Sequence, residues 1–440
     1  MHLHSYKLSN YRRMRETRIT LGSDISIFVG ANNSGKTSAT QAIQTFLSGQ
    51  KDRFSFYDFN SSAWNALDEL GADPDEATAI DALPTIELDL WFEVAAEDLY
   101  LVLALLPSTS WEGSLVGVRI KFAPKDPIEL FANYSKAREE AKQNLEKLGE
   151  VAGSYLPWPK NLTDFLRKEL TGEYELQYFV LDQARFNGEF EEEANYEPLP
   201  LVGDDKGGAI LRSLVRVDSL NAQRHLADPA SNQSAPTGRA EDLSKRLSRF
   251  YQRNLDQRQA DHSALMALFN SEKELNSHLA NVFEGTLKKL ATLGYPGLQN
   301  PRLVIKSALN PESVMRQDAR VHYALDDTDD GNALPDTYNG LGFKNLIYMV
   351  VELLDLHANW IDEEENRPPL HLIFIEEPEA HLHAQLQQVF VRNVLELLKE
   401  ESPGAFNSQL VVVCPHESGP LFELVPASDM ELRHGQEINA

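Results

Sequence analysis

The sequence predicts an α/β fold, and three stretches of the chain predict it. Asp24–Gly30 has the pattern of a short buried strand that runs into glycine, and a helix is expected to follow over Lys36–Leu47. Leu370–Glu377 has the pattern of an apolar strand that ends in two glutamates, and Gln409–Cys414 that of another buried strand. Apolar strands that alternate with helices in this way are typical of an α/β fold.

The remaining elements are taken in chain order. Further strands are expected over Thr85–Val94, Val116–Pro124 and Tyr174–Asp182, with a charged helix over Tyr134–Glu150. Because the helical region over Arg239–Leu293 has no sustained heptad repeat, it predicts a short helical arm rather than a long coiled coil. The later elements are strands at Arg302–Leu309 and Arg320–Leu325, an acidic loop at Asp326–Gly340, and helices at Phe343–Trp360 and His383–Glu401.

Composition excludes several classes of protein. The 440 residues carry a formal net charge of −26, so we expect any contact with DNA to be local rather than spread over the whole surface. No apolar run approaches the ~20 residues of a membrane helix, and the polar N-terminus does not resemble a secretory signal. Cys414 is the single cysteine, which excludes an intrachain disulfide. These features predict a cytoplasmic protein without a membrane partner.

The segment GANNSGKT, Gly30–Thr37, fits the pattern G-x-x-x-x-G-K-[ST] between a predicted strand and a predicted helix. Its small residues allow backbone N–H groups to surround a triphosphate at the positive end of the helix. In this pattern Lys36 reaches the β- and γ-phosphates, and the Thr37 hydroxyl binds Mg²⁺. The expected nucleotide-binding residues are Gly30, Asn32, Asn33, Ser34, Gly35, Lys36, Thr37 and Ser38.

An acidic pair at the end of a second strand completes the predicted ATP site. Glu376 is expected to hold Mg²⁺ through water, and Glu377 to polarise the attacking water. Two adjacent carboxylates at a buried strand end are costly unless a cation lies beside them. Because the two motifs stand near opposite ends of the sequence, they suit an ATPase head that is divided by a large insertion.

A second glycine-rich turn consists of Asn339, Gly340, Leu341 and Gly342 at the start of a predicted helix. A helix N-terminus of this kind is an anion site. If it lies at the opposite edge of the head from the first loop, one nucleotide cannot occupy both sites of one chain. We therefore expect a homodimer or higher oligomer in which this turn caps the γ-phosphate bound by the other subunit. The alternative is a plain helix-capping turn.

Together, the segments NNSGKT, YNGLGFKNLIYM and FIEEPEAHLHAQLQQVF resemble the OLD family of ATP-dependent endonucleases. More broadly, they resemble the ABC-type ATPases of the RecF, SMC and Rad50 group. The resemblance runs from LSNYRRM to about Val413 and implies an ABC-type P-loop ATPase head assembled from N- and C-terminal lobes. It implies Lys36, Thr37 and Glu376 as ligands of ATP and Mg²⁺, and Glu377 as the hydrolytic base.

The same resemblance assigns roles to further positions. It implies that Asn339–Gly342 is the signature turn acting in trans, and that Pro378–Gln385 crosses the dimer interface. The element NYRRM implies that Arg12 or Arg13 contacts the nucleotide. His416 stands where the family has a γ-phosphate-sensing histidine, but CPHESGP lacks the usual Ser-Thr-His-Ser neighbours.

OLD proteins usually continue into a Toprim nuclease domain, and the short segment after His416 cannot form one. We therefore expect no nuclease activity from this chain alone. Either it is a stand-alone ATPase that acts with a separate nuclease or effector, or it is the truncated ATPase half of such a nuclease.

Other interpretations remain open from the residues alone. Glu377, Glu379, His381 and His383 could form a hydrolytic metal site, although interface or core histidines beside an ATP site are favoured. Cys414, at the end of an apolar strand, is expected to be a buried structural thiol.

The expected domains are an N-terminal lobe with the P-loop over 1–125, an insertion with the helical arm over 126–300, a C-terminal lobe over 301–425 and a tail over 426–440. The expected function is an ATP-hydrolysing subunit coupled to DNA processing or repair, or to defence against phage. A nucleotide-gated scaffold with little hydrolysis is the alternative, prompted by the neighbours of His416. An ABC transporter motor fits less well, because NGLGFKN differs from the transporter Leu-Ser-Gly-Gly pattern.

Overall fold

A computed structural model describes residues 1–30, 34–72, 83–109, 111–148, 157–201, 206–221, 266–267, 269–279, 281, 322–324, 333–335, 341–363, 367–378, 390, 394, 398 and 407–415. The chain divides into two compact units. The first comprises residues 1–222, 356–379 and 383–440, and the second comprises residues 223–355 and 380–382. The domain boundaries expected from the sequence stay predictions. Within the described residues, no helix has both the length and the apolar character that crossing a membrane requires.

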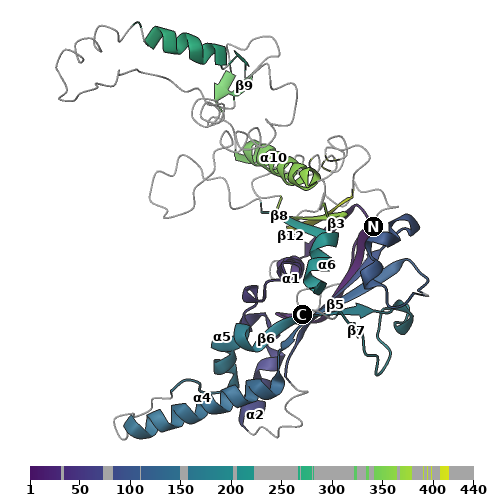
Figure 1. The fold of residues 1–440 in the computed structure, drawn as a ribbon, viewed down its shortest axis with the longest axis vertical. Coiled ribbons are helices and arrows are strands. Elements are labelled where there is room, and N and C mark those ends of the chain that lie inside the picture. Colours follow the sequence, from purple (N-terminus) through teal and green to yellow (C-terminus); the bar gives the residue numbers. More distant parts are fainter. Residues whose placement is uncertain are drawn as a thin grey trace, which may run out of the picture. The chain divides into compact units, whose positions relative to one another are not determined.

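An antiparallel sheet forms one part of the first unit (Figure 1). Its strands, in spatial order, are β2 (Met14–Thr20), β1 (His2–Tyr11), β4 (Ile86–Glu93), β5 (Leu115–Pro124), β6 (Tyr174–Leu181) and β7 (Leu199–Pro200). In β4, the side chains of Ile86, Leu88 and Leu90 alternate along the strand and are fully buried. This period of two is the reason that the sequence pattern predicted β4, and the three strands predicted within this sheet are confirmed.

The second sheet of this unit is parallel and contains strands from distant parts of the chain. Its order is β3 (Ile25–Gly30), β12 (Ser408–Pro415), β11 (Leu370–Glu376) and β8 (Val215–Asn221). Gly30 at the end of β3 pairs with Pro415, and Glu376 at the end of β11 pairs with Val413. The carboxyl ends of β3, β12 and β11 therefore lie at the same edge, where open α/β sheets bind their ligands. The predicted α/β fold is confirmed.

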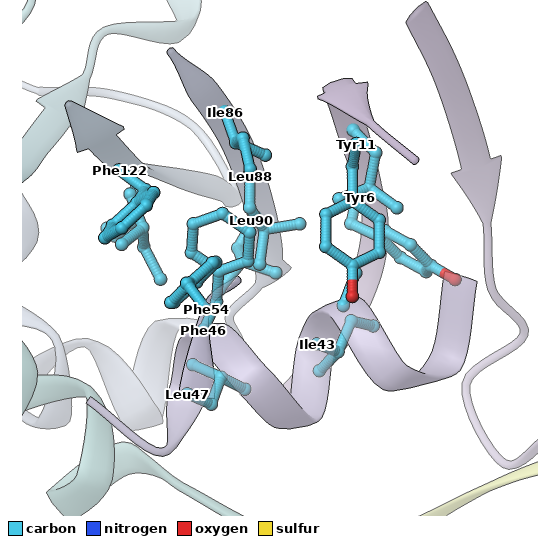
Figure 2. Packing of buried hydrophobic residues seen from close by; sticks show 14 of the residues in the cluster. Tyr6, Tyr11, Ile43, Phe46, Leu47, Phe54, Ile86, Leu88, Leu90 and Phe122 are labelled. Carbon is cyan, nitrogen blue, oxygen red and sulfur yellow. The ribbon is translucent and has the colours of Figure 1, made fainter. Parts of the chain in front are cut away.

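Helix α1 (Lys36–Leu47), which has the predicted bounds, connects the two sheets. It contacts β1 and β4 of the antiparallel sheet and β3 and β8 of the parallel sheet. Its apolar side chains recur at helical spacing, and Ile43 and Phe46 are fully buried against the core. Figure 2 shows Ile43 on α1 below Tyr6 of β1, with Leu88 and Leu90 of β4 beside them. The helix that carries Lys36 is thus fixed by the hydrophobic core.

Other helices and short 3-10 turns complete the first unit. The helices are α2 (Ser62–Ala72), α4 (Pro127–Leu148), α5 (Leu162–Glu173) and α6 (Lys206–Leu214). The 3-10 turns are η1 (Lys51–Arg53), η2 (Phe56–Asp58), η3 (Ala96–Leu101), η4 (Leu103–Leu105) and η6 (Gln183–Arg185). Helix α5 contacts α2, α4 and β6, whereas α6 contacts β6, β8 and α1. Within the predicted C-terminal helix, the described residues Phe390, Val394 and Leu398 are helical and buried at a spacing of four.

The second unit contains a short antiparallel pair, β9 (His322–Ala324) and β10 (Ala333–Pro335). Strand β10 lies inside the expected acidic loop, so that expectation is wrong at these three residues, which pair with β9 in an antiparallel ladder. Helix α10 (Leu341–Asp362) begins in the second unit's segment of the chain and ends in the first's. In the predicted helical arm, residues 269–279 are helical, and most of the remainder lies outside the described residues.

A buried polar cluster occupies the amino ends of the parallel strands, at the opposite edge of the sheet from Gly30 and Glu376. His371 is fully buried, and its Nε2 lies 2.9 Å from Asp218 Oδ2. Arg216 Nε donates to the same oxygen at 2.8 Å. Ser408 Oγ lies 3.5 Å from Nδ1 of both His371 and His357. These contacts partner the polar groups that the strands carry into the core.

Because of this cluster, we expect the free energy of unfolding to fall as the pH is lowered. Burial lowers the pKa of His357 to about 4, and the neighbouring His371 and Arg367 act in the same direction. Below pH ~6.5 the unfolded chain therefore binds a proton that the folded chain takes up only near pH 4. We expect His357 to reduce the free energy of unfolding by about 1.5 kcal/mol between pH 6.5 and 5. Urea unfolding at several pH values, followed by tryptophan fluorescence, measures this slope.

The variant His357→Gln should show a shallower dependence on pH over the same range, because it lacks the imidazole. The matched control is His278→Gln, which removes an exposed imidazole. Equal slopes in His357→Gln and the wild type would contradict the prediction.

Candidate active site

The glycine-rich loop lies between β3 and α1. Gly35 precedes α1 with a φ of 94°, a left-handed conformation that favours glycine. A Cβ atom at Gly35 would lie 3.1 Å from Cε of Met14, so space is also limited there. Residues 31–33, which include the predicted ligands Asn32 and Asn33, lie outside the described residues. The described part of the loop is therefore the tight strand–turn–helix that the motif predicts.

The Lys36 side chain folds back across this loop. Its Nζ donates to the carbonyl oxygen of Gly30 and lies 3.5 Å from Ser34 Oγ. Lys36 is also largely buried. A buried ammonium favours a site where it meets negative charge. The loop thus places one positive charge at the amino end of α1, where the helix dipole already favours an anion.

The two glutamates at the end of β11 differ in their surroundings. Thr40 Oγ1, on α1, donates to Glu376 Oε1 at 3.0 Å and also lies 3.1 Å from the carbonyl oxygen of Thr37. Glu377 continues the strand pairing, since its N–H donates to Val413 O at 3.0 Å. Its φ of 52° is left-handed, which costs energy for a residue with a Cβ. The first carboxylate is thereby linked to the P-loop helix, and the second is held in a strained backbone position.

A cavity of about 610 Å³ brings these groups together. Its lining consists of Arg12, Arg13, Ser34, Gly35, Lys36, Thr37, Ser38, Tyr57, Phe59, Ser61, Trp64, Glu376, Glu377, Val413 and Cys414. Three cationic side chains and two carboxylates thus share one concave site. An anionic ligand with a bound cation matches this arrangement of charges.

Arg12 is fixed in this cavity by contacts with two elements. Its Nε donates to Asp58 Oδ1 at 2.8 Å, and its Nη1 donates to Gln41 Oε1 at 2.7 Å. Asn60 Nδ2 donates to the Arg12 carbonyl oxygen at 2.7 Å, and Arg12 itself has a left-handed φ of 49°. These contacts orient the guanidinium before any ligand arrives.

The structure places most of the predicted ATP-site residues that it describes on this one cavity. Arg12, Ser34–Ser38, Glu376 and Glu377 line it, and Gly30 contacts Lys36 beside it. Leu341 and Gly342 form the start of α10, within the second unit. The predicted positions outside the described residues are Asn32, Asn33, Asn339, Gly340, His416, Glu379, His381 and His383. Cys414, expected to be buried, is fully buried.

Sequence reasoning missed several side chains of the site. Thr40 stands three residues after Thr37 on the same helix, so helical spacing was a signal that could have identified it. Tyr57 and Trp64 carry no comparable signal, because their place in the cavity depends on how η2 and α2 pack. Among the described residues, no group of three or more His, Cys, Asp or Glu side chains forms a metal cluster.

The bond between Thr40 and Glu376 leads to a stability prediction. Thr40→Val keeps the shape of the side chain but removes the donor, which leaves a carboxylate oxygen less well satisfied. We expect the free energy of unfolding to fall by about 1.5 kcal/mol, the range for a hydrogen bond to a charged group. Chemical denaturation measures the change. The control Thr20→Val alters an exposed residue of β2, and an equal effect in both variants would contradict the prediction.

A glycine loop that holds a buried lysine, together with a carboxylate pair at the end of another parallel strand of the same sheet, defines a P-loop nucleotide-binding protein. The model of the AAA ATPase domain family matches residues 1–416, and the chain belongs to this family. Membership of this family means that the chain contains an ATPase domain, which binds ATP.

Two further proteins are similar to this chain. Endonuclease GajA of Bacillus cereus (strain HuB5-5) is 29% identical over 161 residues, which are 33% of this chain and 22% of that protein. The match therefore spans about a fifth of that relative's length. The solved SMC head domain from Thermotoga maritima aligns over 96% of this chain and 92% of its own, with 14% identity and a TM-score of 0.33.

Proposed function

We propose that this chain binds ATP with Mg²⁺ in the cavity at the carboxyl edge of the parallel sheet and hydrolyses it. One observation carries the proposal: Lys36 of the early glycine loop and the late Glu376–Glu377 pair line the same cavity. Lys36, Arg12 and Arg13 supply positive charge for the phosphates. Backbone N–H groups at the start of α1 supply further donors, since they have no partner within the helix.

The donor set suits magnesium. Mg²⁺ binds oxygen ligands and usually takes only one or two from protein, the rest coming from water and substrate phosphates. In this proposal the Thr37 hydroxyl is one such ligand, and Glu376 binds through water. When bound, Mg²⁺ neutralises charge on the phosphate oxygens. The hydrogen bond from Thr40 to Glu376 supports this role, because it holds the carboxylate next to the helix that begins at Lys36.

Glu377 is the proposed hydrolytic base. Its side chain lines the cavity, and its strained backbone is the kind of local cost that structures retain at functional positions. The carboxylate accepts a proton from water as the water oxygen bonds to the γ-phosphorus. The bond between that phosphorus and the β–γ bridging oxygen breaks, and ADP leaves. Lys36 stabilises the charge that develops on the phosphoryl oxygens. Catalysis then depends mainly on positioning and charge.

The partners of this activity are also proposals. A second copy of the chain would bring its Asn339–Gly342 turn to the γ-phosphate. ATP would then lie between the two subunits of a homodimer, which we place in the cytoplasm. His416 is proposed to sense the same phosphate. The similarity to a protein named as an endonuclease supports coupling to a nuclease effector. Local contact with DNA and a role in DNA repair or defence against phage are proposed from the resemblance to the OLD family alone.

A phosphate-release assay on the purified chain tests the proposal. We expect steady release of phosphate from ATP with Mg²⁺ and none with EDTA. Light scattering after gel filtration should show a larger species with ATP than without it. Tight ATP binding without release would instead support the nucleotide-gated scaffold. An absence of ATP binding would contradict both functions.

A further inference from the structure

One wall of the cavity is aromatic rather than charged. Tyr57, Phe59 and Trp64 line it, from η2, the residue after η2 and the first turn of α2. Phe59 is 1% exposed and belongs to the core, whereas Tyr57 is 61% exposed. Trp64 is half-buried. We call Tyr57 and Trp64 the aromatic wall, since these are the two rings of the three that solvent reaches.

Packing behind the aromatic wall holds its rings in place. The ring centroids of Tyr57 and Trp64 lie 6.1 Å apart at 73°, and that of Phe56 lies 5.6 Å from Trp64. The Arg167 guanidinium carbon lies 5.6 Å from the Tyr57 centroid. Trp64 Nε1 donates to Phe59 O at 3.3 Å. The wall is therefore built before a ligand binds, so little side-chain entropy is lost on binding.

The aromatic wall is also joined to the phosphate-binding part of the cavity. In η2, Ser55 and Asp58 form a capping box in which the Asp58 carboxylate accepts from the backbone N–H of Ser55 at 2.8 Å. The other oxygen of Asp58 accepts from Arg12. Asp58 therefore does two things: it closes the turn that contains Tyr57, and it orients the guanidinium of Arg12. A ligand that spans both regions needs an anionic end and a flat apolar end.

A nucleoside triphosphate has both ends. We infer that Tyr57 and Trp64 hold the nucleobase of the nucleotide whose phosphates lie at the glycine loop. Because the two rings meet at 73°, the flat base stacks on one of them and contacts the other at its edge. This inference rests on the proposed nucleotide site and adds the residues that bind its base. An exposed tyrosine held beside a cationic cavity is suited to stacking, since aromatic side chains bind bases through their faces. Trp64 Nε1 is already bonded to Phe59, so the indole contributes its ring rather than its N–H.

Calorimetric titration of the full chain with two ligands tests the inference. The ligands are MgATP and magnesium tripolyphosphate, which carries the phosphates without a base. Tyr57→Leu should weaken MgATP binding about tenfold, as loss of one base-stacking side chain predicts, and leave tripolyphosphate binding unchanged. Tyr57→Phe keeps the ring and should bind MgATP as the wild type does. Trp64→Leu should repeat the selective loss.

The outcomes separate this inference from the proposed function. Unchanged MgATP affinity in Tyr57→Leu and Trp64→Leu would overturn the inference and leave the ATP site standing. Equal losses for both ligands would also overturn it, because the damage would then lie in the phosphate site. If the wild type bound neither ligand, the proposed function itself would be wrong.

Discussion

Replacing Glu377 with glutamine should stop ATP turnover and leave ATP binding intact. The amide keeps nearly the same size and still lines the cavity, but it cannot take a proton from the attacking water. A positioned general base typically contributes 10²- to 10⁴-fold to a rate, so we expect turnover to fall at least ~100-fold. Phosphate release measures the turnover, and calorimetric titration measures MgATP binding.

The control for this variant is Glu69→Gln, which alters an exposed carboxylate on α2. It should hydrolyse ATP at the wild-type rate. Because bound ATP persists in Glu377→Gln, a larger fraction of this variant than of the wild type should elute as a dimer in gel filtration with ATP. Turnover within threefold of the wild type in Glu377→Gln would remove Glu377 from the mechanism.

Replacing Lys36 with alanine should weaken ATP binding about 100-fold and stop turnover. Lys36 is largely buried within a cationic cavity, and its ammonium is the proposed partner of the β- and γ-phosphates. Loss of a buried charge-assisted contact of about 2.7 kcal/mol corresponds to about 100-fold weaker binding. MgATP should therefore raise the thermal midpoint of the wild type but not that of Lys36→Ala.

The matched control for Lys36→Ala is Lys51→Ala, in which an exposed lysine of η1 is removed. It should keep the thermal shift with MgATP. A shift of equal size in Lys36→Ala and the wild type would show that the phosphates bind elsewhere, and would contradict the proposed site.

Much of the fold follows from local sequence patterns. Strand β4 and helix α1 were predictable because their apolar residues repeat with periods of two and 3.6. The end of β11 was predictable because an apolar run stops at Glu376. The sequence also predicted that Lys36 and Glu376 would share one ATP site, because a P-loop requires an acidic partner at the end of another strand, and both side chains line the same cavity.

The remaining features depend on tertiary contacts that no local pattern records. Strand β8 carries Arg216 and Asp218 into the parallel sheet, which makes its sequence resemble a surface segment. His371 lies on β11, and it contacts Asp218 only after the sheet has formed. Tyr57 could not be predicted as a site residue for a similar reason. Its position depends on the capping box of η2 and on the packing of α2 and α5.

The order β3-β12-β11-β8 has a consequence for synthesis on the ribosome. Strand β12, formed by residues 408–415, lies between β3 and β11, so neither inner edge is covered until those late residues have been translated. The N-terminal antiparallel strands can pair long before that point. The backbone N–H and C=O groups of β3 that later bond to β12 stay unpaired until then. Pairings of such long sequence separation form slowly and leave nascent chains prone to aggregation. We therefore expect the edge of β3 to stay unpaired in the nascent chain until residues 408–415 have emerged from the ribosome.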